Sequence, residues 1–115
     1  MTSKPTTQKG KSGEKQAIDY LLNNGYNLVC TNYRFGRREI DIIVEKSQII
    51  IFVEVKLRKN KSFGNPEDFV SDAQIQRIHE AAEEYIYNQK WLGKIRFDVI
   101  AIIDGKEIFH IQDAF

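Results

Sequence analysis

The stretch that decides the fold covers residues 38–58 and reads REIDIIVEKSQIIIFVEVKLR. Two apolar, β-branched runs, Ile40–Val44 and Ile49–Val55, flank the polar residues 45–48, which is typical of a β-hairpin. The second run is apolar at successive positions rather than at alternate ones. That pattern indicates a central strand whose two faces are both covered.

Three charged residues stand out in this apolar setting, because Asp41 interrupts the first run and Glu54 and Lys56 end the second. Side chains on a strand alternate between faces, so Glu54 and Lys56 point the same way, about 7 Å apart along the chain. An even-numbered loop that sets Asp41 opposite Phe52 puts Asp41 on the face of Glu54 and diagonal to it, about 7–8 Å away between α-carbons. A one-residue shift would turn Asp41 to the other face. The expected cluster indicates a metal site with a positively charged neighbour.

Length and composition indicate one globular domain, since 115 residues with 42% hydrophobic and 29% charged residues are ordinary values. No apolar stretch approaches the roughly 20 residues that span a bilayer, and the N-terminus lacks the apolar segment of a secretory signal. The single cysteine, Cys30, cannot form an internal disulfide. We therefore expect a cytoplasmic protein with a flexible tail over residues 1–11 and one domain over residues 12–115.

The formal net charge of +1 hides an uneven distribution. Basic residues group within 9–15, 34–38 and 56–61, whereas acidic residues group within 67–72 and 80–84. Basic groups around one mouth would attract a polyanion such as nucleic acid. A solvated surface of mixed sign accounts for the same residues.

Five further elements surround the hairpin, and their order predicts an α/β fold. They are a helix over 13–24 capped by Ser12, a strand over Tyr26–Arg34, a helix over Ser71–Gln89, and strands over Ile95–Ile103 and Glu107–Ile111. Three consecutive strands suit an antiparallel meander, and the second helix is long enough to cross over to a parallel strand. The order α-β-β-β-α-β-β therefore predicts an α/β sandwich with a mixed sheet.

These residues resemble a known superfamily. Asp41, 13 residues ahead of Glu54-Val55-Lys56, resembles the PD-(D/E)XK arrangement of restriction-endonuclease-like nucleases, and Glu14 matches the extra N-terminal carboxylate of the Holliday-junction-resolvase branch. The chain is more closely similar to the YraN-like family of predicted bacterial endonucleases. The matching segments are Gly13-Glu14, Asn32-Tyr33-Arg34, Glu39-Ile40-Asp41, Phe52-Val53-Glu54-Val55-Lys56, Phe63-Gly64-Asn65-Pro66, Arg77-Ile78, Arg96-Phe97-Asp98-Val99 and His110–Phe115.

The resemblance implies a restriction-endonuclease-like αβββαβ core, in which helices flank a mixed central sheet. It implies a Mg²⁺-dependent endonuclease, with Mn²⁺ as an alternative, that hydrolyses phosphodiester bonds in branched or structured DNA. Asp41, Glu54 and the carbonyl of Val55 would bind the metal. Lys56 would orient the attacking water and stabilise developing charge, and Glu14 would bind the metal through water or hold a second ion. Nucleic acid would contact Arg34, Arg37, Arg58, Lys59, Lys61, Gln74 and Arg77.

Two positions depart from the family pattern. Arg38 stands where the family usually has glycine, which puts a bulky cation beside the proposed site. Gln74 stands where the family often has lysine, although some relatives in the wider superfamily place a glutamine on this helix near the metal. Gln74 also has capping-box spacing from Ser71, which is a sufficient structural reason for it. The departures bear on substrate preference more than on fold.

Simpler interpretations stay open for several residues. Glu14 would be favoured in the first turn of a helix by the helix dipole. Glu54 and Lys56 could form an ordinary ion pair at the end of a strand. For Asp98 we predict a structural hydrogen-bonding role, and we place His79 and His110 at the surface or the edge of the core.

A second class of function fits the same residues. A nucleic-acid-binding module could keep the fold and its charges without turnover, and Arg38 makes this alternative a serious one. Resolvase-type symmetry would require a homodimer, for which the sequence shows no interface.

Overall fold

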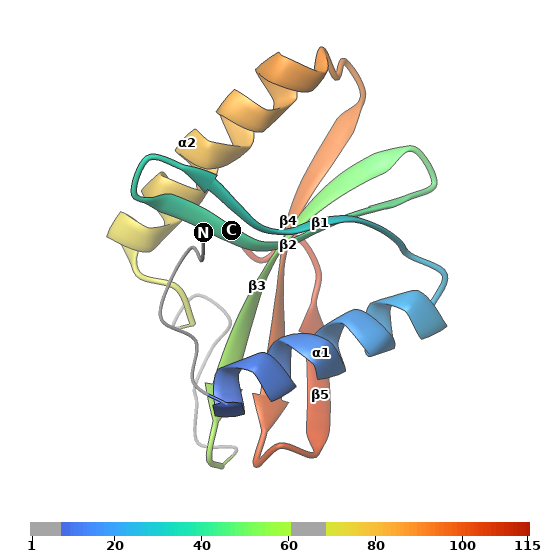
Figure 1. The fold of residues 1–115 in the computed structure, drawn as a ribbon, viewed down its shortest axis with the longest axis vertical. Coiled ribbons are helices and arrows are strands. Elements are labelled where there is room, and N and C mark those ends of the chain that lie inside the picture. Colours follow the sequence, from blue (N-terminus) through green and yellow to red (C-terminus); the bar gives the residue numbers. More distant parts are fainter. Residues whose placement is uncertain (1–7, 61–68) are drawn as a thin grey trace.

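The computed structural model describes residues 8–60 and 69–115, which form a five-stranded sheet with one helix on each face (Figure 1). The elements are α1 (Gln8–Asn23), β1 (Asn27–Phe35), β2 (Arg38–Lys46), β3 (Ile49–Arg58), α2 (Asp72–Gln89), β4 (Lys94–Ile103) and β5 (Glu107–Ile111). The strands lie in the order β1-β2-β3-β4-β5, and all neighbours are antiparallel except β3 and β4. The predicted α/β fold with a mixed sheet is confirmed, in the αβββαβ arrangement.

Both faces of the central strands are buried, which explains the unbroken apolar run of β3. Ile51 and Val53 pack beneath α1 against Ala17 and Leu21. Phe52 packs on the other side, within the layer that α2 covers. The α2 side of the core also contains Ile43, Ile78, Ala81, Ala82, Tyr85, Val99 and Ala101. The central position predicted for this strand is confirmed.

The crossover between the parallel strands β3 and β4 brings the start of α2 to one end of the sheet. Since β3 and β4 run in the same direction, the chain must return along α2, whose first turn lies at the end of the sheet where β3 finishes. Ser71 caps α2 by accepting a hydrogen bond of 3.1 Å from the backbone N–H of Gln74, as the capping-box spacing predicted. The cap therefore places the Gln74 side chain near the last residues of β3.

The first helix begins earlier than predicted. The helix predicted over 13–24 is confirmed through Asn23, but Ser12 as its cap is wrong, because α1 runs over Gln8–Asn23 and Ser12 lies inside it. An N-cap preference amounts to only about 1 kcal/mol, so the backbone can continue the helix through a capping residue. Within the proposed flexible tail, residues 8–11 are helical, and residues 1–7 lie outside the described part of the chain.

A glycine brings α1 close to the sheet. A β-carbon at Gly13 would lie 2.6 Å from a methyl carbon of Leu57 on β3, so this contact is open only to glycine unless Leu57 moves. Gly13 is buried, and the next residue is Glu14. The close approach therefore holds Glu14 over the end of β3.

The register of the central hairpin differs from the predicted one. Asp41 does not lie opposite Phe52, because Ile43 occupies that position, and continuing the observed ladder puts Asp41 opposite Glu54. The turn is the residue pair Ser47-Gln48, both with positive φ (53° and 64°), which suits the twist of a two-residue hairpin. Neither serine nor glutamine favours that conformation, so composition did not single out this pair. The correction moves Asp41 closer to Glu54 along the strands.

A buried polar network ties the last strands to α1. Asp98 is fully buried and accepts two hydrogen bonds of 2.8 Å from Arg96, one of 2.7 Å from His110 and one of 3.0 Å from the backbone N–H of Asp113. The other ring nitrogen of His110 lies 3.1 Å from the hydroxyl of Tyr20 on α1. The predicted structural role of Asp98 and the core-edge position of His110 are confirmed. Within the described ranges, neither helix has the length and apolar character to cross a bilayer.

Candidate functional site

The Asp41 carboxylate lies between β2 and β3. Asp41 is 3% exposed, and its Oδ2 accepts a hydrogen bond of 2.9 Å from the backbone N–H of Val55. Paired residues of the two strands end at Ile42 and Val53, so this side chain takes the place of a ladder contact just beyond the last pair. Its carboxylate is thereby held against the residue that follows Glu54 and is not turned away from it.

Glu54 and Lys56 are joined by a side chain from α2. Glu54 is 7% exposed, and its Oε2 lies 3.3 Å from the ammonium nitrogen of Lys56. The Gln74 amide nitrogen donates to the same oxygen at 2.6 Å, while the Gln74 amide oxygen accepts from Lys56 at 3.1 Å. Gln74 therefore contacts both charges with its matching atoms, since the nitrogen faces the carboxylate and the oxygen faces the ammonium.

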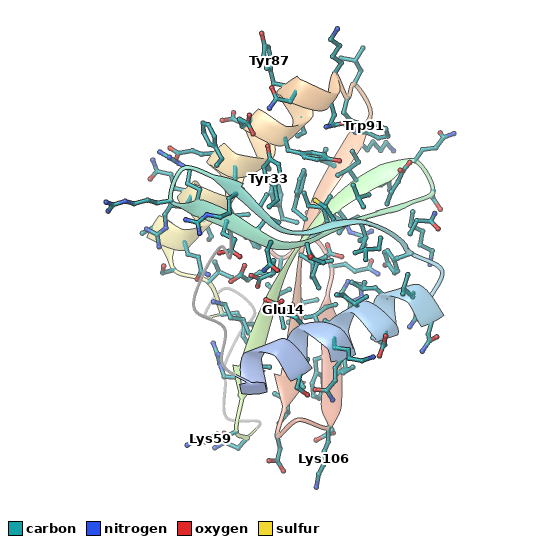
Figure 2. The ribbon with its side chains drawn as sticks, in the orientation of Figure 1. Glu14, Tyr33, Lys59, Tyr87, Trp91 and Lys106 are labelled. Carbon is teal, nitrogen blue, oxygen red and sulfur yellow. The ribbon has the colours of Figure 1, made fainter. Side chains whose placement is uncertain are left out.

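Glu14 lies near the same end of the sheet, on the face that α1 covers and opposite the face covered by α2. The side-chain amide of Asn32 donates to Glu39 at 3.0 Å and to Glu14 at 3.4 Å. Asn32 has a positive φ of 51° and lies across from Asp41 on the neighbouring strand, between the pairs Thr31–Ile42 and Tyr33–Ile40. Figure 2 shows Glu14 on the side of α1 that faces the sheet.

Asn32 is a site residue that the sequence analysis missed as an individual. In the sequence it stands out only within the family-like segment Asn32-Tyr33-Arg34. Asparagine is disfavoured inside strands and tolerates left-handed backbone, so its place in an otherwise regular strand was an available signal. Glu39 is a half-buried partner of Asn32.

The oxygen atoms of Asp41, Glu54 and Val55 suit Mg²⁺ better than zinc. Across residues 8–60 and 69–115, no group of three or more His, Cys, Asp or Glu side chains is placed to hold a metal ion. That argues against a closed zinc-type site there, which needs about four protein ligands. Mg²⁺ binds hard oxygen atoms, keeps several waters and needs only one or two carboxylates. Asp41, Glu54 and the Val55 carbonyl fit that requirement.

Arg38, the bulky cation expected beside the site, is held by α2. Its Nε donates to Glu80 at 2.5 Å, and this hydrogen bond lowers the pKa of the Glu80 carboxyl. The guanidinium carbon also lies 5.4 Å from the centre of the Phe35 ring. Arg38 is therefore directed toward α2 and the hairpin tip.

The predicted nucleic-acid contacts fall into two groups around this end of the molecule. Arg34 and Arg37 lie at the tip of the β1–β2 hairpin, where the Arg34 guanidinium donates to the Gly36 carbonyl at 3.3 Å. Arg77 is exposed on α2, one turn after Gln74.

The second group follows the end of β3. Arg58 donates to the Leu57 carbonyl at 2.9 Å and lies over the ring of Phe69 at 5.6 Å. The Lys59 side chain points away from the sheet at its lower end in Figure 2. Lys61 lies outside the described residues, as does the matching segment 63–66. Gln74, which is predicted to contact nucleic acid, forms hydrogen bonds to the charged side chains of Glu54 and Lys56.

Comparison with known proteins finds relatives of similar length that match most of this chain. The profile of the uncharacterised protein family UPF0102 matches residues 13–102. A UPF0102 protein of Cytophaga hutchinsonii is 42% identical over 106 residues, which cover 92% of this chain and 94% of the relative. Relatives from Sulfurihydrogenibium sp. (43% over 110 residues, 95% of each chain) and Thermodesulfovibrio yellowstonii (46% over 106 residues, 92% and 94%) are also named UPF0102 proteins.

Proposed function

The chain belongs to the uncharacterised protein family UPF0102, and from that premise we propose that it is a metal-dependent endonuclease acting on branched or structured DNA. The observation that carries the proposal is the hydrogen bond from Val55 to Asp41, which holds one buried carboxylate beside the strand segment that bears another, Glu54. Buried carboxylates are costly unless opposite charge balances them. Lys56 lies beside the Glu54 carboxylate, and a divalent cation bound between Asp41 and Glu54 would balance the charge of both acids.

The residues that would hold the cation are Asp41, Glu54 and the Val55 carbonyl. A bound Mg²⁺ would polarise the phosphoryl group and lower the pKa of an attacking water. The protein itself supplies the remaining charge through Lys56. An ammonium has three N–H donors, and the contacts to Glu54 and Gln74 use two of them. The third would bind a phosphate oxygen or the attacking water, where it stabilises negative charge that develops during the reaction.

Gln74 would act as a positioning residue. Its amide bonds to both Glu54 and Lys56, so neither side chain can swing away without breaking a hydrogen bond. Hydrogen bonds to charged groups are stronger than those between neutral groups, which suits a glutamine to this task. The lysine common at this position in the family would instead bring a second cation.

The experiment that tests the proposal is cleavage of labelled four-way junctions, flaps and single strands in Mg²⁺, Mn²⁺ or EDTA. We expect cleavage that needs the metal and disappears in Asp41→Ala and Glu54→Ala. Asp19→Ala is the matched control, because Asp19 is an exposed acid on α1 whose partner is Lys15. It should cleave like the parent protein.

A non-catalytic nucleic-acid-binding module is the second candidate. The observation in its favour is that the described residues form no three-membered cluster of metal-binding side chains. Salt-sensitive binding without cleavage in any metal would select this candidate and reject the hydrolase. A cytoplasmic location and a homodimer stay predictions alongside either one.

A further inference from the structure

An aromatic ring is exposed at the tip of the β1–β2 hairpin. Phe35 is the last residue of β1 and is 40% exposed. The turn that follows is Gly36-Arg37, in which Gly36 has a φ of 64°. The ring is surrounded in sequence by Arg34, Arg37 and Arg38. An apolar ring among guanidinium groups is suited to a ligand that carries both an aromatic face and negative charge.

The ring has a defined neighbour. Phe35 and Arg38 are paired across the hairpin, and the guanidinium carbon of Arg38 lies 5.4 Å from the ring centre. Glu80 holds Arg38 from α2. The ring is therefore supported from within the molecule while much of its surface stays open to solvent.

Phe35 also shares a face of the sheet with the candidate site. Tyr33, two residues earlier on β1, packs against Tyr85 of α2 at 5.2 Å between ring centres, so Phe35 points to the α2 face as well. That face holds Gln74 and its bonded partner Glu54. In Figure 1 the turn of the hairpin lies beside the first half of α2.

The distance from the hairpin tip to the site suits a short piece of nucleic acid. Arg38 and Asp41 are three residues apart on β2, which is roughly 10 Å of extended chain. Stacked nucleotides rise about 3.4 Å each along one strand. A base at the tip would thus lie within about three nucleotides of the phosphate at the site.

We propose that Phe35 is a stacking site for an unpaired nucleobase close to the cleaved phosphodiester. Every base has an aromatic face, but bases inside a duplex already stack on their neighbours and are not available to a side chain. The ring would therefore select nucleic acids with a boundary between duplex and single strand. The inference rests on the proposed function, since it names the class of substrate that the same site would accept.

Binding measured without metal tests the stacking site separately from cleavage. Fluorescence anisotropy in EDTA would compare a fully paired duplex with a duplex of equal length that carries a single-stranded flap. Phe35→Ala should weaken binding to the flapped duplex by roughly 5- to 150-fold, the range that base–aromatic stacking provides. Binding to the paired duplex should not change. Phe35→Tyr should bind like the parent protein, because it keeps the ring.

The matched control is Leu28→Ala. Leu28 lies at the other end of β1 and has nearly the same exposure as Phe35, 43% against 40%. It should bind both substrates like the parent protein. Equal losses for Phe35→Ala on the flapped and the paired duplex would overturn the stacking site.

Removal of single bases identifies the partner of the ring. Abasic nucleotides placed in turn along the first part of the flap should weaken binding at one position in the parent protein and not in Phe35→Ala, because the two losses share one interaction. Additive losses at every position would overturn the proposal. Flap binding through Phe35 without cleavage in any metal would leave the stacking site in place and remove the hydrolase. If Phe35→Ala cleaves flaps as well as the parent protein does, the hydrolase stays in place and the stacking site is removed.

Discussion

The Val55 backbone N–H donates a hydrogen bond to the Asp41 carboxylate at 2.9 Å, at the point where β2 and β3 stop pairing. In this contact the buried Asp41 carboxylate takes the place of a backbone hydrogen-bond acceptor of the sheet. The hydrogen bond sets the position of the carboxylate relative to Glu54. A side chain that replaces a ladder hydrogen bond has little freedom to rotate away. The carboxylate is therefore held in one position before any ligand arrives.

Asp41→Asn should separate the structural role of this residue from its charge. The amide oxygen of asparagine can accept the Val55 hydrogen bond, but it binds a divalent cation less well than a carboxylate does. We expect Mn²⁺ affinity, measured by calorimetry, to fall by at least about tenfold, which is the smallest loss usual even for residues that only support a metal ligand. Thermal stability without metal should change little. Unaltered Mn²⁺ affinity would remove Asp41 from the set of metal ligands.

Gln74→Leu should leave Glu54 and Lys56 without their shared amide partner. Loss of a hydrogen-bond partner for a buried polar group costs about 1–3 kcal/mol, so the free energy of unfolding in urea should fall by about that amount. We also expect slower cleavage, since both side chains gain freedom. Gln76→Leu is the control, because Gln76 is exposed on the same helix and its side-chain amide donates to Glu80 at 3.4 Å. Similar results for the two variants would show that Gln74 does not position the site.

Asp98→Asn should be among the most destabilising substitutions in the described core. The carboxylate is fully buried and holds both Arg96 and His110, so neutralising it leaves a guanidinium short of its partner. Breaking a buried ion pair on one side costs about 3–5 kcal/mol. Urea unfolding measures this loss. Asp113→Asn, which keeps the backbone N–H donor and a residue tolerant of the local φ of 54°, should have a small effect.

Acid should weaken the fold through the same carboxyl group. Burial alone would raise the pKa of Asp98, but the hydrogen bonds from His110, Arg96 and Asp113 outweigh it and hold the pKa below its usual value. A lowered folded-state pKa means that the stabilisation is present above the unfolded value of about 3.9 and is lost as the pH falls through the folded one. The stability difference between the parent protein and Asp98→Asn should therefore shrink below about pH 4. A constant difference down to pH 2 would contradict the assignment.

Arg37→Ala should weaken nucleic-acid binding in a way that depends on salt and not on sequence. Arg37 is exposed at the hairpin tip, where a guanidinium can contact a backbone phosphate. Loss of one such contact should reduce the slope of log affinity against log salt concentration by about 1. Lys94→Ala is the control, since Lys94 starts β4 at the opposite end of the sheet from the end of β3. Equal slopes for all three proteins would exclude a phosphate contact at Arg37.

Local patterns identified the elements because their causes are local. The apolar run of β3 and the cap at Ser71 each follow from neighbouring residues, and the structure has both. The start of α1 was wrong, because a cap preference is too weak to end a helix by itself. The hairpin register was wrong for a related reason, since Ser47-Gln48 gives no strong signal for a two-residue turn.

The sequence by itself determined the α/β order of elements, the burial of the central strand and the grouping of Asp41, Glu54 and Lys56. Hydrophobic periodicity and residue spacing depend only on residues that are close together in the sequence. Only the tertiary structure decided that Gln74 joins Glu54 to Lys56, that Asn32 joins Glu14 to Glu39, and that Glu80 draws Arg38 toward α2. Those contacts link residues on different elements. They depend on where the crossover sets α2 and on how closely Gly13 lets α1 approach the sheet, and both are properties of packing.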